Sequence, residues 1–108
     1  MPRQITVHDL AEKLKAKKPV YLLDVRQPWE HDVAALPGSV LIPLPELPAR
    51  LHEVQPPPGA LIVVYCHHGI RSLSGAAILE RGGIGPAVSL AGGIDAWAME
   101  VDAGVARY

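Results

Sequence analysis

The sequence predicts an α/β protein: an open, mainly parallel sheet of about five strands with helices on both faces. Near-continuous apolar runs at residues 20–25 and 61–65 are typical of parallel strands that are covered on both sides. Segments with helical spacing of apolar residues alternate with the strands, as crossover connections require. The 108 residues are enough for one hydrophobic core, so we expect a single domain over residues 1–108.

The first segment, residues 4–14, is typical of a short strand that leads into a helix. Thr6 is the candidate N-cap, because its hydroxyl can accept a hydrogen bond from a backbone N–H of the first helical turn. Apolar residues then recur at helical spacing, at Val7, Leu10, Ala11 and Leu14. The lysines that follow are interpreted as cations at the helix C-terminus rather than as a nucleic-acid patch, and Pro19 ends the helix.

The strand over residues 20–25 brings two charged residues, Asp24 and Arg26, to the rim of the sheet. Ligands of open α/β sheets bind beyond the carboxyl ends of the strands, so we expect both residues near the loop after the strand 61–65. They could contact substrate, or they could form a polar brace in which Arg26 pairs with Glu30 and Asp24 accepts backbone amides. We favour the brace, because a carboxylate beside an anionic substrate would raise the energy of both.

The middle of the chain predicts short elements. Residues 27–33 are typical of a turn and a helical segment. Trp29 could line the mouth of the pocket, but we expect it at the edge of the core, where tryptophan packs more often. A short strand is predicted over residues 39–43 and a short helix over residues 45–51. The proline run at 56–59 is interpreted as a stiff loop before the next strand rather than as a polyproline ligand.

The loop after the strand 61–65 begins with the only cysteine, Cys66. Gly69 permits the positive φ of a tight loop, and Arg71 and Ser72 stand where a helix would start. Backbone N–H groups of such a loop can stabilise a thiolate and hold an anion above it, each charge-assisted hydrogen bond contributing about 1.5–3 kcal/mol. We interpret this segment as an anion-cradling nucleophile loop. A buried structural cysteine is the alternative, but it leaves the glycine and arginine spacing unexplained.

The segment after this loop predicts a helix that packs on the sheet. Small residues at 74–77 allow a close approach, Arg81-Gly82-Gly83 supplies a glycine C-cap, and the next strand covers residues 87–90.

A tight turn at Gly92-Gly93 is then expected to return the chain to the same edge of the sheet. It lacks the GxGxxG pattern of a phosphate-binding loop. A final helix is predicted over residues 94–99, with Trp97 as a core anchor, and the tail over residues 101–108 is predicted to be irregular.

Four stretches, which together cover most of the chain, resemble the rhodanese-like sulfurtransferases. They are Leu23-Asp24-Val25-Arg26 with Glu30, Leu36-Pro37-Gly38-Ser39 with Ile42-Pro43, the Cys66-x-x-Gly69-x-Arg71-Ser72 loop, and Leu90-Ala91-Gly92-Gly93-Ile94-Asp95-Ala96-Trp97. Residues 34–39 depart from the family, which usually carries Gly-His-Ile-Pro-Gly-Ala there. The resemblance implies that Cys66 accepts a sulfane sulfur as a persulfide and passes it to a nucleophile.

The resemblance also implies the site residues. Cys66 is the expected nucleophile. The expected substrate-binding residues are His67, His68, Gly69, Ile70 and Arg71, and the supporting residues are Asp24, Arg26 and Ser72. Backbone amides of residues 67–71 would stabilise the persulfide anion, and the Arg71 side chain would steer an anionic donor. Compatible donors are thiosulfate and a persulfide, including that of a cysteine desulfurase; compatible acceptors are a thiol, cyanide and a sulfur-carrier protein.

Two other classes of function stay open. Cysteine phosphatases and the related arsenate reductases also use a loop from Cys to Arg, but the phosphatase signature has five intervening residues and this chain has four, 67–70. No residue stands out as the general acid that phosphatase chemistry needs. A non-catalytic rhodanese-like module that binds a partner is the remaining alternative, although this chain retains Cys66, Gly69 and Arg71.

Composition excludes several other classes. A net charge of −1 does not favour nucleic-acid binding, and no apolar run reaches the roughly 18 residues that a membrane helix needs. A single cysteine excludes an internal disulfide and a multi-cysteine zinc site, and His31 and His52 are expected at the surface without a second ligand at metal spacing. We therefore expect no metal and no cofactor, and a cytoplasmic location.

Overall fold

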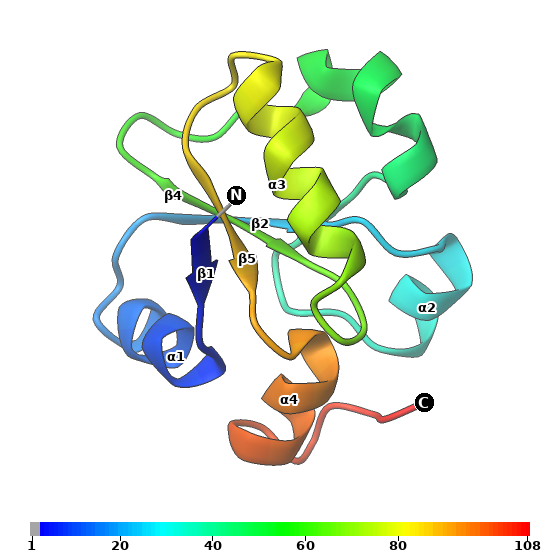
Figure 1. The fold of residues 1–108 in the computed structure, drawn as a ribbon. Helices are drawn as coiled ribbons and strands as arrows, with labels where there is room; N and C mark the ends of the chain where they lie inside the picture. Colours follow the sequence, from blue (N-terminus) through cyan, green and yellow to red (C-terminus); the bar gives the residue numbers. More distant parts are fainter. Residues whose placement is uncertain (1–2) are drawn as a thin grey trace.

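A computed structural model describes residues 3–108, which form one five-stranded sheet flanked by helices (Figure 1). The strands are β1 (Arg3–Ile5), β2 (Val20–Asp24), β3 (Val40–Leu41), β4 (Leu61–Tyr65) and β5 (Ala87–Leu90). The helices are α1 (Val7–Lys15), α2 (Pro28–Val33), the 3₁₀ segment η1 (Leu44–Glu53), α3 (Arg71–Arg81) and α4 (Gly93–Glu100). The strand order is β1-β5-β4-β2-β3 and every neighbouring pair is parallel, which confirms the predicted fold class.

The central strand β4 separates two hydrophobic clusters, one on each face of the sheet. Its side chains alternate between them: Val63 and Tyr65 belong to one cluster, and Ile62 and Val64 to the other. Helices α1 and α4 cover the first face, whereas α3 and η1 cover the second. Since a fully buried aliphatic side chain contributes about 1.5–3 kcal/mol, these two clusters supply the main driving force for folding.

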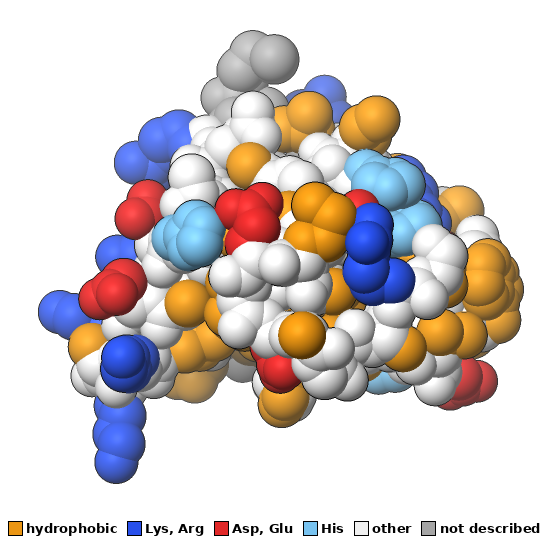
Figure 2. Space-filling view, turned by 90° about the horizontal axis from the view of Figure 1, so that it is seen from below, with side chains coloured by type: hydrophobic (Ala, Val, Ile, Leu, Met, Phe, Trp, Pro, Cys, Tyr) orange, Lys and Arg blue, Asp and Glu red, His pale blue; other side chains and the backbone are white. Residues whose placement is uncertain are grey.

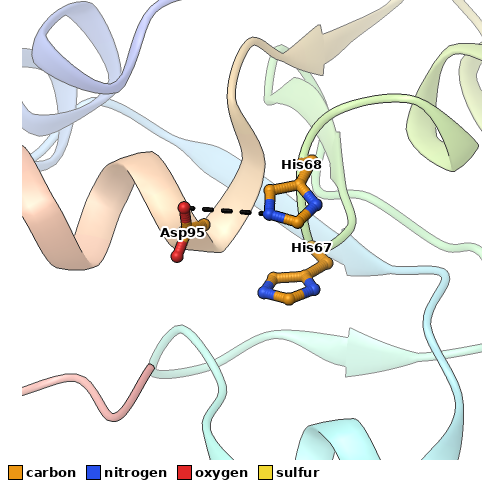
Figure 3. Close-up of side chains that lie close together, drawn as sticks. All are labelled: His67, His68 and Asp95. Carbon is orange, nitrogen blue, oxygen red and sulfur yellow. Dashed lines mark ion pairs between the residues drawn. The ribbon is translucent and has the colours of Figure 1, made fainter. Parts of the chain in front are cut away.

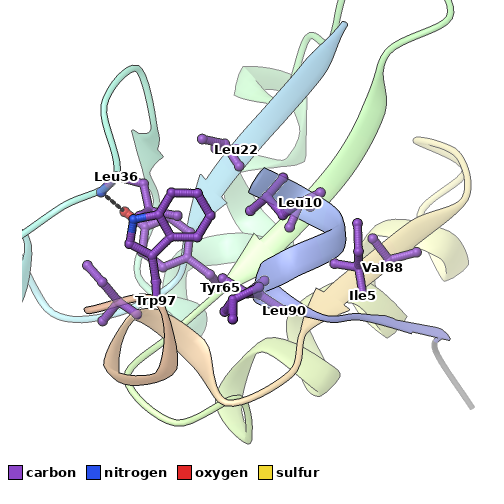
Figure 4. Close-up of a cluster of buried hydrophobic side chains, with 11 residues drawn as sticks. Ile5, Leu10, Leu22, Leu36, Tyr65, Val88, Leu90 and Trp97 are labelled. Carbon is purple, nitrogen blue, oxygen red and sulfur yellow. Dashed lines mark hydrogen bonds between the residues drawn. The ribbon is translucent and has the colours of Figure 1, made fainter. Parts of the chain in front are cut away.

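Trp97 and Tyr65 anchor the cluster under α1 and α4 (Figure 4). Trp97 is buried, which confirms its predicted place in the core. The Tyr65 ring is fully buried, and its hydroxyl accepts a hydrogen bond from Leu36 N at 3.1 Å. This bond ties the loop between α2 and β3 to the end of β4, beside which the cysteine loop begins.

The expected local signals at the start of α1 are present. Thr6 is the N-cap, and its Oγ1 accepts a hydrogen bond from Asp9 N at 3.1 Å. On the other face, Gly75 of α3 confirms the predicted close approach of helix and sheet, because a Cβ at this position would lie 2.9 Å from Val64 Cγ1.

Two of the predicted elements and the predicted place of Trp29 differ in the structure. The strand predicted over residues 39–43 is only Val40–Leu41, and the predicted helix over 45–51 is a 3₁₀ segment with a kink at Arg50. Pro48 lies inside that segment, and its missing N–H removes an α-helical hydrogen bond. The prediction for Trp29 was wrong: its side chain is 59% exposed near the start of α2 and does not pack at the core edge.

The tail over residues 101–108 contains no helix or strand, as predicted, and it runs back past α4 toward α2. None of the helices within residues 3–108 has the length and apolar composition that a membrane crossing needs.

Candidate active site

The loop between β4 and α3 wraps around the sulfur of Cys66. The Cys66 side chain is buried, with the residue 1% exposed. Gly69 N–H donates a hydrogen bond to Cys66 Sγ at 3.1 Å, and Ser72 N–H, in the first turn of α3, donates another at 3.4 Å. Both hydrogen bonds would be stronger to a thiolate than to a thiol, because charge-assisted hydrogen bonds are about twice as strong as neutral ones. The loop geometry therefore favours a negatively charged sulfur.

Two serine hydroxyls lie beneath this sulfur. Ser72 Oγ lies 3.5 Å from Cys66 Sγ and 2.7 Å from Ser89 Oγ of β5, and both serines are fully buried. The thiol can donate to Ser72 Oγ, and reversal of the hydroxyl chain lets Ser72 donate to a thiolate instead. Ser72 was among the predicted supporting residues, whereas Ser89 was missed because a serine inside a strand carries no sequence signal for this contact.

Gly69 has the positive φ that the loop was predicted to need, +95°. A Cβ at this position would lie 2.9 Å from Gly92 N and 3.1 Å from Leu90 O. Glycine is therefore needed at this position for two reasons: the backbone has a positive φ, and the turn after β5 leaves no space for a Cβ.

The turn at Gly92-Gly93 holds the cysteine loop from the other side. Cys66 O accepts a hydrogen bond from Ile94 N at 2.9 Å, and His67 O accepts one from Asp95 N at 3.0 Å. A Cβ at Gly93 would lie 2.4 Å from both carbonyl oxygens. The first turn of α4 thus binds the loop carbonyls directly, while the Gly69 N–H is left to face the sulfur.

Arg71 binds Glu30 across the mouth of this loop. Its Nη1 and Nη2 donate to Glu30 Oε1 and Oε2 at 2.7 and 2.9 Å. The Glu30 side chain is only 4% exposed, and its Oε1 also accepts from Gln27 N at 3.0 Å. The hydrogen bonds from Arg71, with smaller contributions from Gln27 and Tyr108, lower the pKa of Glu30 to about 2. The positive charge of Arg71 is therefore offset by a fixed carboxylate.

Arg26 does not form the predicted ion pair with the Glu30 carboxylate; within Glu30, its Nη1 donates to the main-chain oxygen alone, at 3.3 Å. Arg26 instead donates through Nε and Nη2 to the two oxygens of Asp24, at 2.8 and 2.7 Å, and both side chains are fully buried. Asp24 also accepts from Arg26 N at 3.0 Å and contacts His31 Nδ1 at 2.8 Å. Arg26 and Asp24 are sequence neighbours at the end of β2, so they pair locally and leave the Glu30 carboxylate to Arg71.

Tyr108 joins these two ion pairs, and sequence reasoning missed it. Its hydroxyl accepts a hydrogen bond from Arg26 Nη1 and donates one to Glu30 Oε2, both at 2.7 Å. Its ring stacks on His67 at 4.0 Å and meets Trp29 edge-on at 5.7 Å. An aromatic residue in an irregular tail has no periodicity that would locate it, so no signal in the sequence could have found this contact.

The remaining predicted residues lie at the rim of the loop. His67 and His68 have stacked rings 3.9 Å apart, with Asp95 beside them (Figure 3). The Ile70 side chain is 76% exposed and points away from the core. Figure 2 views this end of the molecule and shows histidine and basic side chains side by side at its surface.

The amides of the loop do not all point inward. Among residues 67–71, the N–H within hydrogen-bonding distance of Cys66 Sγ is that of Gly69. The second N–H donor, Ser72, was predicted only as a supporting residue.

A surface hollow of about 540 Å³ lies at the opposite end of the sheet from Cys66. It is lined by the proline run 56–58, by residues 59–62 and by residues 84–86. None of these lining residues carries a titratable or nucleophilic side chain.

Comparison with known proteins agrees with the family resemblance seen in the sequence. Residues 6–100 match the family described as Rhodanese-like domain. The chain is 34% identical over 98 residues to a sulfurtransferase of Allochromatium vinosum, covering 91% of this chain and 90% of that protein.

It is also 33% identical over 104 residues to a probable adenylyltransferase/sulfurtransferase, MoeZ, of Mycobacterium tuberculosis, covering 96% of this chain and 26% of the relative's length. Among solved structures, a rhodanese-like domain protein from Staphylococcus aureus superposes with a TM-score of 0.81 at 31% identity, covering 98% of both chains. The chain belongs to the rhodanese-like domain family, whose relatives include proteins named sulfurtransferases.

Proposed function

We propose that this protein is a sulfurtransferase that carries sulfane sulfur as a persulfide on Cys66. The observation that carries the proposal is the pair of N–H groups, from Gly69 and Ser72, that point at Cys66 Sγ. These donors and the N-terminus of α3 favour negative charge on the sulfur, which a nucleophilic thiolate and a persulfide both carry. The sulfurtransferase relatives support the same reaction class.

The reaction would proceed in two displacement steps. The Cys66 thiolate attacks the outer sulfur of thiosulfate, a new S–S bond forms, and sulfite leaves with the electrons of the broken bond. A persulfide donor would release a thiolate in the same way. In the second step cyanide, or a thiolate on a small thiol or on a sulfur-carrier protein, attacks the terminal sulfur and forms a new bond to it, and Cys66 leaves as a thiolate. No oxidant or reductant is consumed.

The arginine at the loop mouth would contribute less to donor binding than its charge suggests. Because Glu30 offsets Arg71, an anionic donor meets a nearly neutral ion pair. Donor recognition would therefore fall mainly to the backbone of residues 67–71, to the half-buried ring of His67 and to the exposed ring of His68. Asp24 and Arg26 lie buried behind the loop and would support it without touching substrate.

The partners would be a small anionic sulfur donor and a sulfur-accepting thiol or carrier protein. The MoeZ relative, whose name joins adenylyltransferase and sulfurtransferase, supports a carrier-type acceptor. A cysteine desulfurase is a compatible protein donor. We propose a cytoplasmic location on the composition of the chain alone, with its single free cysteine.

Mass spectrometry of the intact protein tests this proposal. After brief incubation with thiosulfate or glutathione persulfide, the wild-type protein should gain the mass of one sulfur, and a thiol reductant should remove it. The Cys66→Ser variant, checked for native folding by circular dichroism, should gain nothing. If the wild type gains no sulfur from either donor, sulfur transfer is wrong, and phosphatase and partner-binding assays decide between the remaining classes.

A further inference from the structure

We propose that His67, His68 and Asp95 form a binding site for a divalent transition-metal ion of the Zn²⁺ class at the rim of the cysteine loop. One nitrogen from each histidine and one carboxylate oxygen of Asp95 lie within 4.8 Å of one another (Figure 3). Two imidazoles and a carboxylate suit Zn²⁺, Cu²⁺ or Ni²⁺, whereas Ca²⁺ and Mg²⁺ prefer oxygen ligands alone. Metal binding at this site does not require the Cys66 thiol, although two of the ligands also belong to the proposed donor-binding loop.

Backbone hydrogen bonds fix the two segments that carry the three ligands relative to each other. Asp95 N in α4 donates a hydrogen bond to His67 O in the cysteine loop at 3.0 Å. The two segments that supply the ligands are therefore bonded directly to each other. A second bond, from Ile94 N to Cys66 O at 2.9 Å, ties the same two segments together. These segments are already ordered in the folded protein. Binding an ion therefore costs only the conformational entropy of the ligand side chains.

Side-chain rotation is needed to close the site. An ion held at about 2.0–2.2 Å from each ligand draws the ligand atoms closer together than they now lie. The rings of His67 and His68 are stacked, so their nitrogens border the same space without converging on one point. The His68 side chain is 62% exposed, so it has room to rotate. Only a small rotation is needed, because His68 Nε2 already lies 3.8 Å from Asp95 Oδ2.

Arg107 competes for the same carboxylate. Its Nε and Nη2 lie 3.0 and 3.4 Å from the two oxygens of Asp95, and its side chain is exposed. An ion must therefore displace or share this exposed ion pair, which is worth little in water. This competition gives the proposal a specific signature, because removing the Arg107 side chain should strengthen metal binding.

Calorimetric titration of untagged protein with ZnCl₂ tests the site. Wild type and Cys66→Ser should each bind one ion, since the thiol is not a ligand. His68→Ala and Asp95→Asn should each weaken binding about tenfold or more, Arg107→Ala should strengthen it, and His52→Ala, an exposed histidine elsewhere, should leave it unchanged. Co²⁺ absorption, which reports nitrogen and oxygen coordination, gives a second readout.

Three results would overturn the proposal: no binding by wild type, binding that survives both His68→Ala and Asp95→Asn, or binding that disappears in folded Cys66→Ser. The last result would assign the ion to the thiolate. Because none of these measurements depends on sulfur transfer, failure of the metal site and failure of the proposed function are distinguishable.

Discussion

Arg71 and Glu30, 41 positions apart in the sequence, are joined by two hydrogen bonds of 2.7 and 2.9 Å across the mouth of the cysteine loop. The pair fixes the last residue of the loop motif to the start of α2. It also decides the electrostatics of the site, because the arginine expected to steer an anionic donor already has a buried carboxylate partner. The charge that a donor meets at the mouth is therefore set by Glu30 as much as by Arg71.

Glu30→Gln should lower the KM for thiosulfate several-fold, because it removes the negative charge that offsets Arg71. Steady-state kinetics at low and high salt measure the effect, which should shrink as salt rises. Glu46→Gln is the matched control, since this exposed glutamate pairs with Arg50 away from the loop. A higher KM in Glu30→Gln would show that the Arg71–Glu30 pair holds the loop in shape and that the charge of Glu30 does not weaken donor binding.

Arg71→Ala should raise the KM for thiosulfate more than Glu30→Gln lowers it, because it leaves the buried Glu30 carboxylate without a cationic partner at the mouth of the loop. Adding Glu30→Gln to this variant should restore part of the loss. The comparison of kcat with KM in the single and double variants separates steering from chemistry. An Arg71→Ala enzyme with unchanged thiosulfate kinetics would refute any role of the guanidinium in donor binding.

The acid stability of the protein should depend on Glu30. Its pKa is lowered from 4.5 to about 2, so the stabilisation is present above pH 4.5 and is lost as the pH falls toward 2. A shift of this size corresponds to roughly 3 kcal/mol. Urea unfolding between pH 7 and pH 2 should show a steeper loss of stability in wild type than in Glu30→Gln. Parallel curves for the two proteins would contradict the prediction.

Gly69→Ala should destabilise the protein and impair sulfur transfer together. Alanine must adopt a φ of +95° there, and its Cβ would meet Gly92 N at 2.9 Å, so the N–H that donates to Cys66 Sγ would move. Gly59→Ala separates the two effects, because Gly59 has a φ of +78° with no atom within 4 Å of its Cβ. We expect Gly59→Ala to cost about 1–2 kcal/mol from strain alone and to retain full transfer activity.

Tyr108→Phe should destabilise the protein by about 1–3 kcal/mol, because it removes the hydroxyl that forms hydrogen bonds with both Arg26 and Glu30.

Tyr108→Ala also removes the ring that covers His67. Since burial is the main cause that lowers the pKa of His67, this pKa should rise in Tyr108→Ala and change less in Tyr108→Phe. Urea unfolding and NMR titration of the histidine ring measure the two effects. Equal stability of wild type and Tyr108→Phe would mean that water replaces the hydroxyl.

Local signals in the sequence determined most of the fold and the identity of the central loop. The apolar runs that became β2 and β4 leave no polar face for solvent, so both had to be buried in a parallel sheet. Thr6 caps α1 and Gly69 adopts a positive φ because each depends only on neighbouring residues. The position of the only cysteine at a strand end followed from the same local pattern.

Only the tertiary structure decided which charges pair and what covers the loop. From the sequence, Glu30 was expected to pair with Arg26; the fold paired Arg26 with Asp24 and brought Glu30 within reach of Arg71. The tail carried no periodicity, yet the fold brought Tyr108 onto both ion pairs. Hydrogen bonds and ion pairs act over a few ångströms, so partners distant in sequence are selected by the packing of the chain.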